Sequence, residues 1–434
     1  MNGWRDRLGT AGWWLLMIGL ALLIGWIAPQ QPLVALGLGG VVLTLGVSAL
    51  DAAAVPLITL PLLYVAQRLP GPVDVSVSDV ALGVGTAVAL VFCARPLSPP
   101  VRSLLWLTAV YQLSTLFTVV ANPYPANVVE WVHEWFLVGG ALVLGWCVGR
   151  GGHGSLGLKL MLMPGLTLAT WVIGQAAMNY LRGDFQPIYL PYGMHKNFLG
   201  TVLGITALIA YVHPPWLRIG RRLALLSFWW MVLAIGATQS RQAVVGLSVA
   251  LVVLVLRSRT DRRRSKSILL AVVPAVFAVL TLVRDQVASD NQFNSTNQRL
   301  TWFIDSLDLW SSHPLLGVGL RWWYTDRYSG GFQPPNAEME VLTSAGLVGL
   351  VGFLVLMLGA LVVLWRVEPV YGALALLAVL SRFVQAQLDI FWVAGQVSIP
   401  FVIAGICLGV QALRASDAAP LGDALPVRAA SRVA

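Results

Sequence analysis

The sequence has little charge for its length. Of its 434 residues only 11% are Asp, Glu, Lys or Arg, whereas 57% are apolar. Soluble proteins carry roughly 25% charged residues, so this composition excludes a water-soluble enzyme of several domains. The charges are also unbalanced, with 28 Lys and Arg against 19 Asp and Glu, a formal net charge of +9. In a membrane protein such an excess orients the helices, so it predicts no nucleic-acid partner.

Cysteines and nucleotide motifs are equally scarce. Cys93, Cys147 and Cys407 each lie in an apolar run, without the C-x-x-C or Cys/His spacing of a disulfide framework or a zinc site. The sequence has no nucleotide-binding glycine loop and no outward-facing Asp-x-Asp metal motif. These absences disfavour a nucleotide-sugar enzyme with a bound divalent ion. We therefore predict neither a metal nor a cofactor.

Long apolar runs dominate instead. Between 12 and 14 windows approach the roughly 20 residues that a transmembrane helix needs, which predicts an all-α polytopic membrane protein. The first run, 11–28, lacks a small-residue cleavage site and reads as a retained signal anchor. Lys and Arg gather in the short loops 95–102, 150–159, 218–222 and 257–266. The alternating loops are poor in positive charge, so the basic loops are predicted to face inward.

The spans and loops divide the chain into four parts. Residues 1–284 form an N-terminal transmembrane bundle, and residues 285–344 form one long outward loop. Residues 345–413 return to apolar helices, and the Ala-, Pro- and Arg-rich tail 414–434 is predicted to be disordered. Loops as long as 285–344 usually carry function.

Two short helices are expected within that loop. Residues 297–310 carry Leu300, Phe303, Ile304 and Leu307 at the i, i+3, i+4, i+7 spacing of an amphipathic helix. Such a helix lies along a bilayer surface. The Pro-Pro-Asn sequence that follows predicts a second helix over 337–345, which leads into the next span.

Several cationic residues lie where a bias of positive charge toward the inside would not place them. A guanidinium at a membrane boundary is costly unless it is paired or used, so each invites a functional explanation. Snorkelling or a structural ion pair is the alternative for any single one. Taken together they suggest a site for an anionic lipid head group, because arginine binds diphosphate oxygens in pairs and keeps its charge. The residues concerned are His195, Lys196, Arg241, Arg299, Arg321, Arg327 and the late-span Arg382.

Three segments resemble the O-antigen ligase and O-antigen polymerase superfamily. Residues 239–246, Gln-Ser-Arg-Gln-Ala-Val-Val-Gly, are similar to its "S-R-x-A" motif. Residues 297–302 with 313–319, ending Pro-Leu-Leu-Gly-Val-Gly, are similar to "R-x-x-W … P-L-L-G-x-G". Residues 336–349 are similar to the motif that opens "H-N-x-Y-L-E" and ends "G-L-x-G". The three span about 110 residues, in the family's order.

The resemblance implies a membrane glycosyltransferase of the bacterial inner membrane with its site on the periplasmic face. Its donor would be an undecaprenyl-diphosphate-linked glycan, and its acceptor a lipid or a glycan. The family's two diphosphate-binding arginines correspond to Arg241 and Arg299. His195, Lys196, Arg321 and Arg382 are further candidates for substrate contacts.

The sequence departs from the family at its loop histidine. That position is Pro335, which cannot exchange a proton, while Asn336 keeps its place. Glu338 lies three residues later on the same helix face, so we predict that it replaces the histidine as the base. Glu340 is the competing choice, and the alternative for both glutamates is a simple helix start. His313 is a further candidate, although its place before Pro-Leu-Leu-Gly favours a turn.

Two other functions remain open from the sequence. A transporter or flippase for an anionic lipid-linked glycan would also use outer cations, but it predicts ionisable residues deep within several spans. Charged residues of this sequence, such as Glu130, His133 and Glu134, lie near span ends instead. The missing histidine leaves a non-catalytic member of the superfamily as the other alternative.

Overall fold

The computed structural model describes residues 12, 15, 18–70, 75–93, 95–257, 295–325, 333–334 and 336–418. Within these ranges the chain is helical and forms no strand, apart from isolated bridges between Arg68 and Ser76 and between Leu190 and Met194. The predicted all-α polytopic class is therefore confirmed. The helices are α2 (Pro32–Leu50), α3 (Ala54–Leu62), α4 (Val77–Phe92), α5 (Pro99–Ala121), α6 (Pro125–Trp135), η1 (Phe136–Gly140), α7 (Ala141–Val148), η2 (Gly149–His153), α8 (Gly154–Leu181), α9 (Lys196–Val212), α10 (Arg221–Thr238), α11 (Arg241–Arg257), α13 (Ser295–Ser312), η3 (Trp322–Tyr324), α14 (Ala337–Arg366), α15 (Pro369–Gln385) and α16 (Ser398–Ala418).

Fewer helices than the 12 to 14 expected are full-length spans. Among the described residues, four helices are long and apolar enough to cross a membrane, and the bent pair Leu38–Leu50 and Ala54–Leu62 adds a fifth if it counts as one span. Other apolar windows form helices of 10–17 residues, such as Lys196–Val212 and Pro369–Gln385. The apolar window 267–284 lies outside the described residues.

One of the four is a continuous helical run of 57 residues, Pro125–Leu181. A straight helix of this length would measure about 85 Å, nearly three times the roughly 30 Å hydrocarbon core. The run breaks at Gly152, whose φ of 85° lies outside the helical region. A Cβ on Gly157 would lie 2.8 Å from the Val148 side chain, so the first turn of α8 contacts the end of α7. The break at Gly152 therefore divides the run into two helical parts.

Glycines bring α7 and α16 into close contact. A Cβ on Gly145 would lie 2.1 Å from a backbone oxygen of α16, and one on Gly405 would lie 2.3 Å from a backbone oxygen of α7. Gly149 and Gly409 repeat the pattern one turn further on. Without a hydrophobic effect between helices in lipid, close backbone packing of this kind holds a bundle together.

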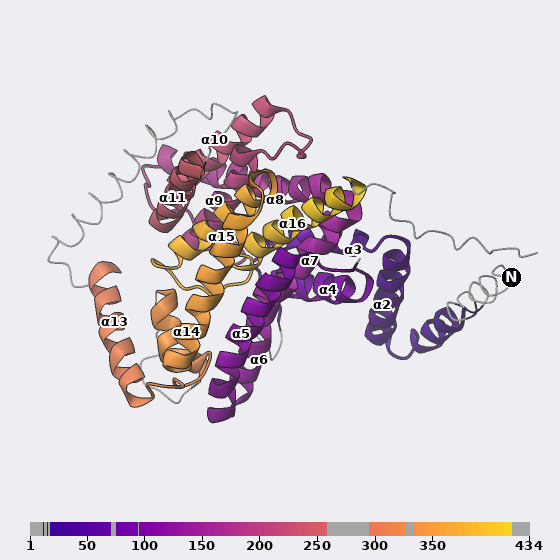
Figure 1. The fold of residues 1–434 in the computed structure, drawn as a ribbon, viewed down its shortest axis with the longest axis horizontal. Coiled ribbons are helices and arrows are strands. Elements are labelled where there is room, and N and C mark those ends of the chain that lie inside the picture. Colours follow the sequence, from indigo (N-terminus) through magenta and orange to yellow (C-terminus); the bar gives the residue numbers. More distant parts are fainter. Residues whose placement is uncertain are drawn as a thin grey trace, which may run out of the picture.

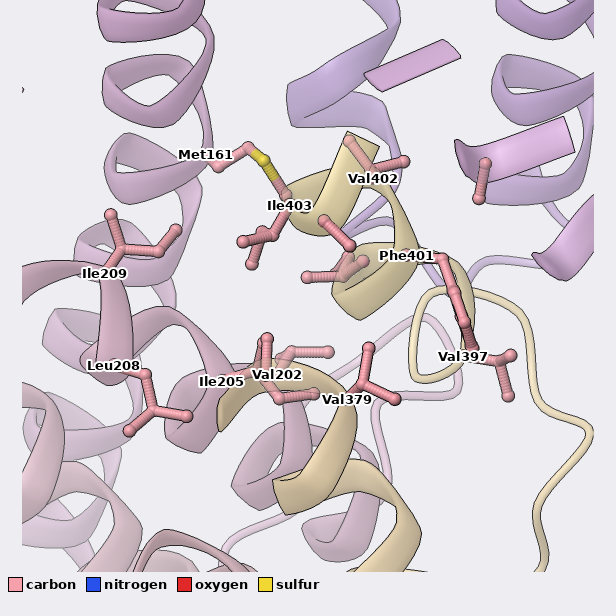
Figure 2. Packing of buried hydrophobic residues seen from close by; sticks show 14 of the residues in the cluster. Met161, Val202, Ile205, Leu208, Ile209, Val379, Val397, Phe401, Val402 and Ile403 are labelled. Carbon is pink, nitrogen blue, oxygen red and sulfur yellow. The ribbon is translucent and has the colours of Figure 1, made fainter. Parts of the chain in front are cut away.

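Apolar side chains from four helices fill the centre of the bundle. Figure 2 shows Met161 of α8 next to Ile403 of α16, with the α9 side chains facing α15 below them. These side chains are almost completely buried. The same cluster contains Val202, Ile205, Leu208, Ile209, Val379, Val397, Phe401 and Val402.

The loop helix α13 lies outside this centre. It contacts α14, which in turn packs along α5, while α2 lies at the opposite side of the molecule (Figure 1). The predicted amphipathic helix over 297–310 is confirmed by α13, and its Leu300 and Ile304 are exposed. An exposed apolar stripe of this kind suits contact with lipid.

Two of the predicted inward loops, 150–159 and 218–222, meet at one end of the bundle, which we call the basic end. The Arg150 guanidinium donates to the Ala412 carbonyl oxygen at 3.2 Å and to Ser416 Oγ at 2.8 Å. At the same end the Arg218 backbone N–H donates to Ser155 Oγ at 3.0 Å. These contacts join two of the predicted inward loops to the end of α16.

The C-terminal boundary differs from the prediction. Helix α16 continues to Ala418, so the first residues of the segment 414–434 are helical rather than disordered. In this extension Arg414 lies over the Tyr371 ring at 6.0 Å, near the start of α15. Residues 419–434 lie outside the described ranges.

Candidate functional site

The Pro-Leu-Leu-Gly-Val-Gly segment docks against the middle of α14 through backbone atoms. The Val318 N–H donates to the Thr343 carbonyl oxygen at 3.0 Å, and the Leu347 N–H donates to the Pro314 carbonyl oxygen at 3.0 Å. Helix α14 opens to accept the segment at Gly346, where φ is 64° and ψ is −164°. Two of the family-like motifs are therefore one structural unit.

Glycine is required on both sides of this unit. A Cβ on Gly346 would lie 2.3 Å from the backbone of Leu315, and a Cβ on Gly317 would lie 2.4 Å from the backbone of Ser344. Both glycines also have positive φ angles, of 64° and 66°. Only glycine satisfies the close approach and the backbone conformation together.

The corner between α5 and α6 holds the rest of the loop. Asn122 Nδ2 donates to the Gly317 carbonyl oxygen at 3.3 Å, and the Tyr124 hydroxyl donates to the Leu320 carbonyl oxygen at 2.6 Å. The Leu320 N–H donates to Asn127 Oδ1 at 2.9 Å, so this backbone unit is fully bonded. The loop is thereby fixed on the corner, and the residue that follows lies over α6.

That residue, Arg321, begins a chain of charged contacts. Its Nε pairs with Glu130 Oε2, and the same oxygen lies 3.2 Å from His133 Nδ1. The other imidazole nitrogen, Nε2, lies 2.9 Å from Asp79 Oδ1. Asp79 Oδ2 accepts from the N–H and the hydroxyl of Ser76 in the capping box that starts α4. Alternating positive and negative groups thus join the loop to α6 and α4.

A second irregular segment, residues 386–397 between α15 and α16, forms the opposite wall. We call it the return segment. Arg382 is completely buried, and its Nη2 donates to the carbonyl oxygens of Ile390, at 2.6 Å, and Phe391. The Phe391 N–H donates to Glu340 Oε2 at 3.0 Å, and Gln333 donates to Glu340 Oε1 at 2.9 Å. These bonds pair backbone groups of the return segment that are not paired within a helix.

A cavity of about 400 Å³ lies between the two walls. This volume falls within the range of small-molecule sites. The return segment, the loop and the first turns of α4 and α9 all contribute to its lining, at the end of the bundle opposite the basic end. Its charged and titratable side chains are Arg68, Asp79, Glu130, His133, His195, Arg321 and Asp389.

Residues 226–354 match the family described as O-antigen ligase. The chain therefore carries an O-antigen ligase domain. It is a multi-pass membrane protein with the general glycosyltransferase chemistry of that family, and a lipid-linked glycan is its broad substrate class. No curated protein matches the sequence.

The O-antigen ligase domain ends within α14, and three predicted site residues lie at the start of this helix. Asn336 caps this helix, since its Oδ1 accepts from the Met339 N–H at 3.0 Å. Glu338 is partly exposed and accepts from Gln387 Nε2 at 2.7 Å. Glu340 is buried and holds the return segment. The predicted roles of these three residues in catalysis and substrate binding stay predictions.

His195 and Lys196 lie at the start of α9, outside the O-antigen ligase domain. His195 lines the cavity, and its Nδ1 accepts from the Asn197 N–H at 3.3 Å as the cap of α9. Its ring meets Tyr189 edge to face, with the ring centres 5.0 Å apart. Burial is the main cause of a lowered His195 pKa, which favours the neutral imidazole. Lys196 is the first residue of the helix itself.

The two arginines predicted to bind diphosphate both belong to the O-antigen ligase domain. Arg241 is the first residue of α11, and the next residue, Gln242, donates to Asp389 Oδ2 on the cavity wall at 2.7 Å. Arg299 lies in the first turns of α13, and its side chain falls outside what the structure describes. Arg327 also lies outside the described residues.

Several residues that line the cavity were not predicted from the sequence. Arg68, Asp79 and Asp389 were not proposed as site residues, although the sequence around Asp389 carries a signal. The stretch 385–396 places Gln385, Gln387, Asp389 and Gln396 between two apolar runs. Such a polar interruption is tolerated at membrane depth where the backbone is buried in protein or lines a cavity.

Proposed function

We propose that the protein transfers a glycan from an undecaprenyl-diphosphate donor to an acceptor hydroxyl on a lipid or a glycan. One observation carries the proposal: Arg321, Trp323 and Gln333 of the O-antigen ligase domain line a polar cavity. A cavity with a few convergent polar groups is the expected form of a small-molecule site. The family supplies the reaction class, and the cavity supplies a place for it.

Arg241 and Arg299 hold the donor diphosphate in this proposal. Guanidinium groups form paired hydrogen bonds to phosphate oxygens and stay charged at every relevant pH. Arg241 also begins a helix, and the positive end of a helix dipole favours an anion there. The arginines would stabilise the charge that develops on the leaving diphosphate, so that the transfer needs no metal ion.

The sidedness of the reaction follows from the charge pattern. Basic loops face the cytoplasm in membrane proteins, so the basic end would lie on that side of a bacterial inner membrane. The cavity, at the opposite end, would then face the periplasm. A cysteine introduced at Asp417 of the basic end, or at exposed Asp184 of the other end, reports this directly. Labelling of intact cells by an impermeant maleimide should reach only the cysteine at position 184.

Transfer can be tested with the purified protein in lipid nanodiscs. The donor is an undecaprenyl-diphosphate glycan, and the readout is a new glycoconjugate. Arg241→Ala and Arg299→Ala should each lower transfer at least 100-fold, whereas Arg218→Ala at the basic end should not. Transfer by both variants at the wild-type rate would refute the diphosphate assignment. Movement of the donor across the bilayer without a new product would instead indicate a flippase, and neither result a non-catalytic protein.

A further inference from the structure

Two side chains that line the cavity carry buried polar atoms without partners in the described part of the chain. Among the described residues, Gln396 Oε1 and Trp392 Nε1 have no hydrogen-bond partner, although these side chains are only 3% and 7% exposed. Both residues line the cavity. An unbonded buried polar atom is costly, so the pair points to a ligand that both donates and accepts hydrogen bonds.

The remaining lining fits a sugar better than an anion. Asp79, Glu130 and Asp389 offset the positive charge of Arg68 and Arg321. Indole rings and amide groups complete the wall, and such groups match the apolar faces and the hydroxyls of a pyranose ring. The indole and amide residues are Trp323, Trp392, Asn197, Gln333 and Gln396.

Asp389 differs from the other two carboxylates of the cavity. Asp79 bonds His133 through one oxygen and Ser76 through the other, and Glu130 is held by Arg321 and His133. Asp389 receives one hydrogen bond, from Gln242 to its Oδ2. In the described part of the chain its Oδ1 makes none. It is also partly exposed, so a ligand can reach it.

His195 lines the same cavity as Asp389 and can donate a hydrogen bond there. The Nδ1 atom of His195 accepts the Asn197 N–H, which requires that this nitrogen carry no proton. A neutral imidazole then carries its proton on Nε2 and donates from there. His195 therefore supplies a donor to a sugar hydroxyl, while Asp389 supplies an acceptor.

We propose that this cavity binds the acceptor sugar and that Asp389 is the general base for its attacking hydroxyl. The inference rests on the proposed glycosyl transfer. The acceptor O–H bond breaks and its proton passes to an Asp389 oxygen, while the acceptor oxygen forms a bond to the anomeric carbon of the donor. The bond from that carbon to the diphosphate breaks, and its electron pair leaves with the diphosphate. Solvent then removes the proton from Asp389.

The geometry favours Asp389 over the loop glutamates. Glu338 has one bonded and one unbonded oxygen, as Asp389 has, but it does not line the cavity. Glu340 has both oxygens bonded, to Phe391 and Gln333. Gln242 bonds Asp389 and follows Arg241 directly, so the proposed base is tied to the helix whose first residue is assigned to the donor.

Asp389→Asn keeps the shape and removes the base. In nanodiscs with the undecaprenyl-diphosphate donor and a glycan acceptor, it should lower kcat by about 10²- to 10⁴-fold. Donor binding and the melting temperature should stay at their wild-type values. Asp389→Ala should lose the same activity and regain part of it with added formate, a result that a merely structural role would not give. Asp417→Asn, the same change at the exposed basic end, is the matched control.

Binding of the acceptor sugar can be tested separately, through the KM for the acceptor. Gln396→Ala should raise KM for the acceptor about 2- to 10-fold, as loss of one hydrogen bond would, and leave donor affinity unchanged. A change in donor affinity alone would show that the cavity is not the acceptor site.

The base assignment is overturned if Asp389→Asn transfers glycan at the wild-type rate. Loss of activity in Glu338→Gln would then move the role of base to Glu338. In that case wild-type transfer still supports the proposed function. If the wild-type protein binds the donor but forms no product, the proposed function fails first, and the assignment of Asp389 falls with it.

Discussion

Gln242 donates a 2.7 Å hydrogen bond to Asp389, 147 residues later in the chain. The bond connects the first turn of α11 to the return segment. Gln242 itself is 3% exposed, so the connection is shielded from bulk water. It places the arginine assigned to the donor and the carboxylate assigned to the acceptor on two adjoining, mutually bonded segments.

Gln242→Ala should therefore impair transfer without removing either charged group. Loss of the bond frees Asp389 to rotate, and a misplacement of about 1 Å can cost roughly 100-fold in rate. We expect kcat to fall by about 10- to 100-fold, with the donor still bound. Gln175→Ala is the control, because the Gln175 amide bonds Asn179 on its own helix. Equal kcat values for the two variants would show that the bond does not position Asp389.

Gly346→Ala should destabilise the folded protein. The added Cβ would meet the Leu315 backbone at 2.3 Å, and the positive φ adds strain. We expect the free energy of unfolding to fall by about 2 kcal/mol or more, measured by denaturant unfolding in detergent. Gly174→Ala on α8 has nothing within 4 Å and should be neutral or stabilising by about 0.5–1 kcal/mol. Similar losses in both variants would contradict the close contact.

Arg382→Leu should also destabilise the protein, through the return segment. The guanidinium bonds two backbone carbonyl oxygens in a completely buried position. Each such charged hydrogen bond is worth about 1.5–3 kcal/mol, and leucine leaves the carbonyl oxygens unbonded. The melting temperature in detergent should fall and transfer should be lost with it. If Arg382 instead only bound substrate, the variant would lose transfer and keep its wild-type melting temperature.

The cap of α9 should make stability depend on pH. Burial lowers the native pKa of His195, so the unfolded chain takes up its proton more readily than the native protein. This contribution is fully present above the unfolded-state pKa of about 6.5. It is lost as the pH falls through the lower native pKa, because protonated Nδ1 can no longer accept the Asn197 N–H. The melting temperature should therefore fall between pH 7.5 and pH 5.

His195→Asn separates this group from the other titrating residues. Asparagine can cap a helix but does not ionise, so the variant should lose less stability than the wild type over the same pH interval. If the melting temperatures of the two proteins fall equally over this interval, protonation of His195 does not contribute to the pH dependence of stability. Transfer measured at pH 7.5 tests the separate role of its Nε2 donor.

Parts of the site followed from local pattern. The apolar spacing at Leu300, Ile304 and Leu307 predicted α13, and the Pro-Pro-Asn sequence predicted the helix that begins at Ala337. Both depend on residues within one or two turns of each other, which sequence alone can relate. The motif around Gly317 also indicated the right family, although not the reason for its glycines. For Gly317 that reason lies 27 residues away, in the backbone of Ser344 on α14.

The sequence by itself determined an all-α membrane protein with an O-antigen ligase domain, because composition, apolar run length and motif order are properties of the chain. Only the tertiary structure decided which polar residues share one cavity. Asp79, His195 and Asp389 lie more than 100 residues apart along the chain, and they meet because the first turns of α4 and α9 and the return segment lie at the same end of the bundle. The same packing buries Arg382, whose bonds are to nearby backbone that a helical pattern does not reveal. Burial and contacts between distant residues depend on how the helices pack, which the local spacing of residues does not determine.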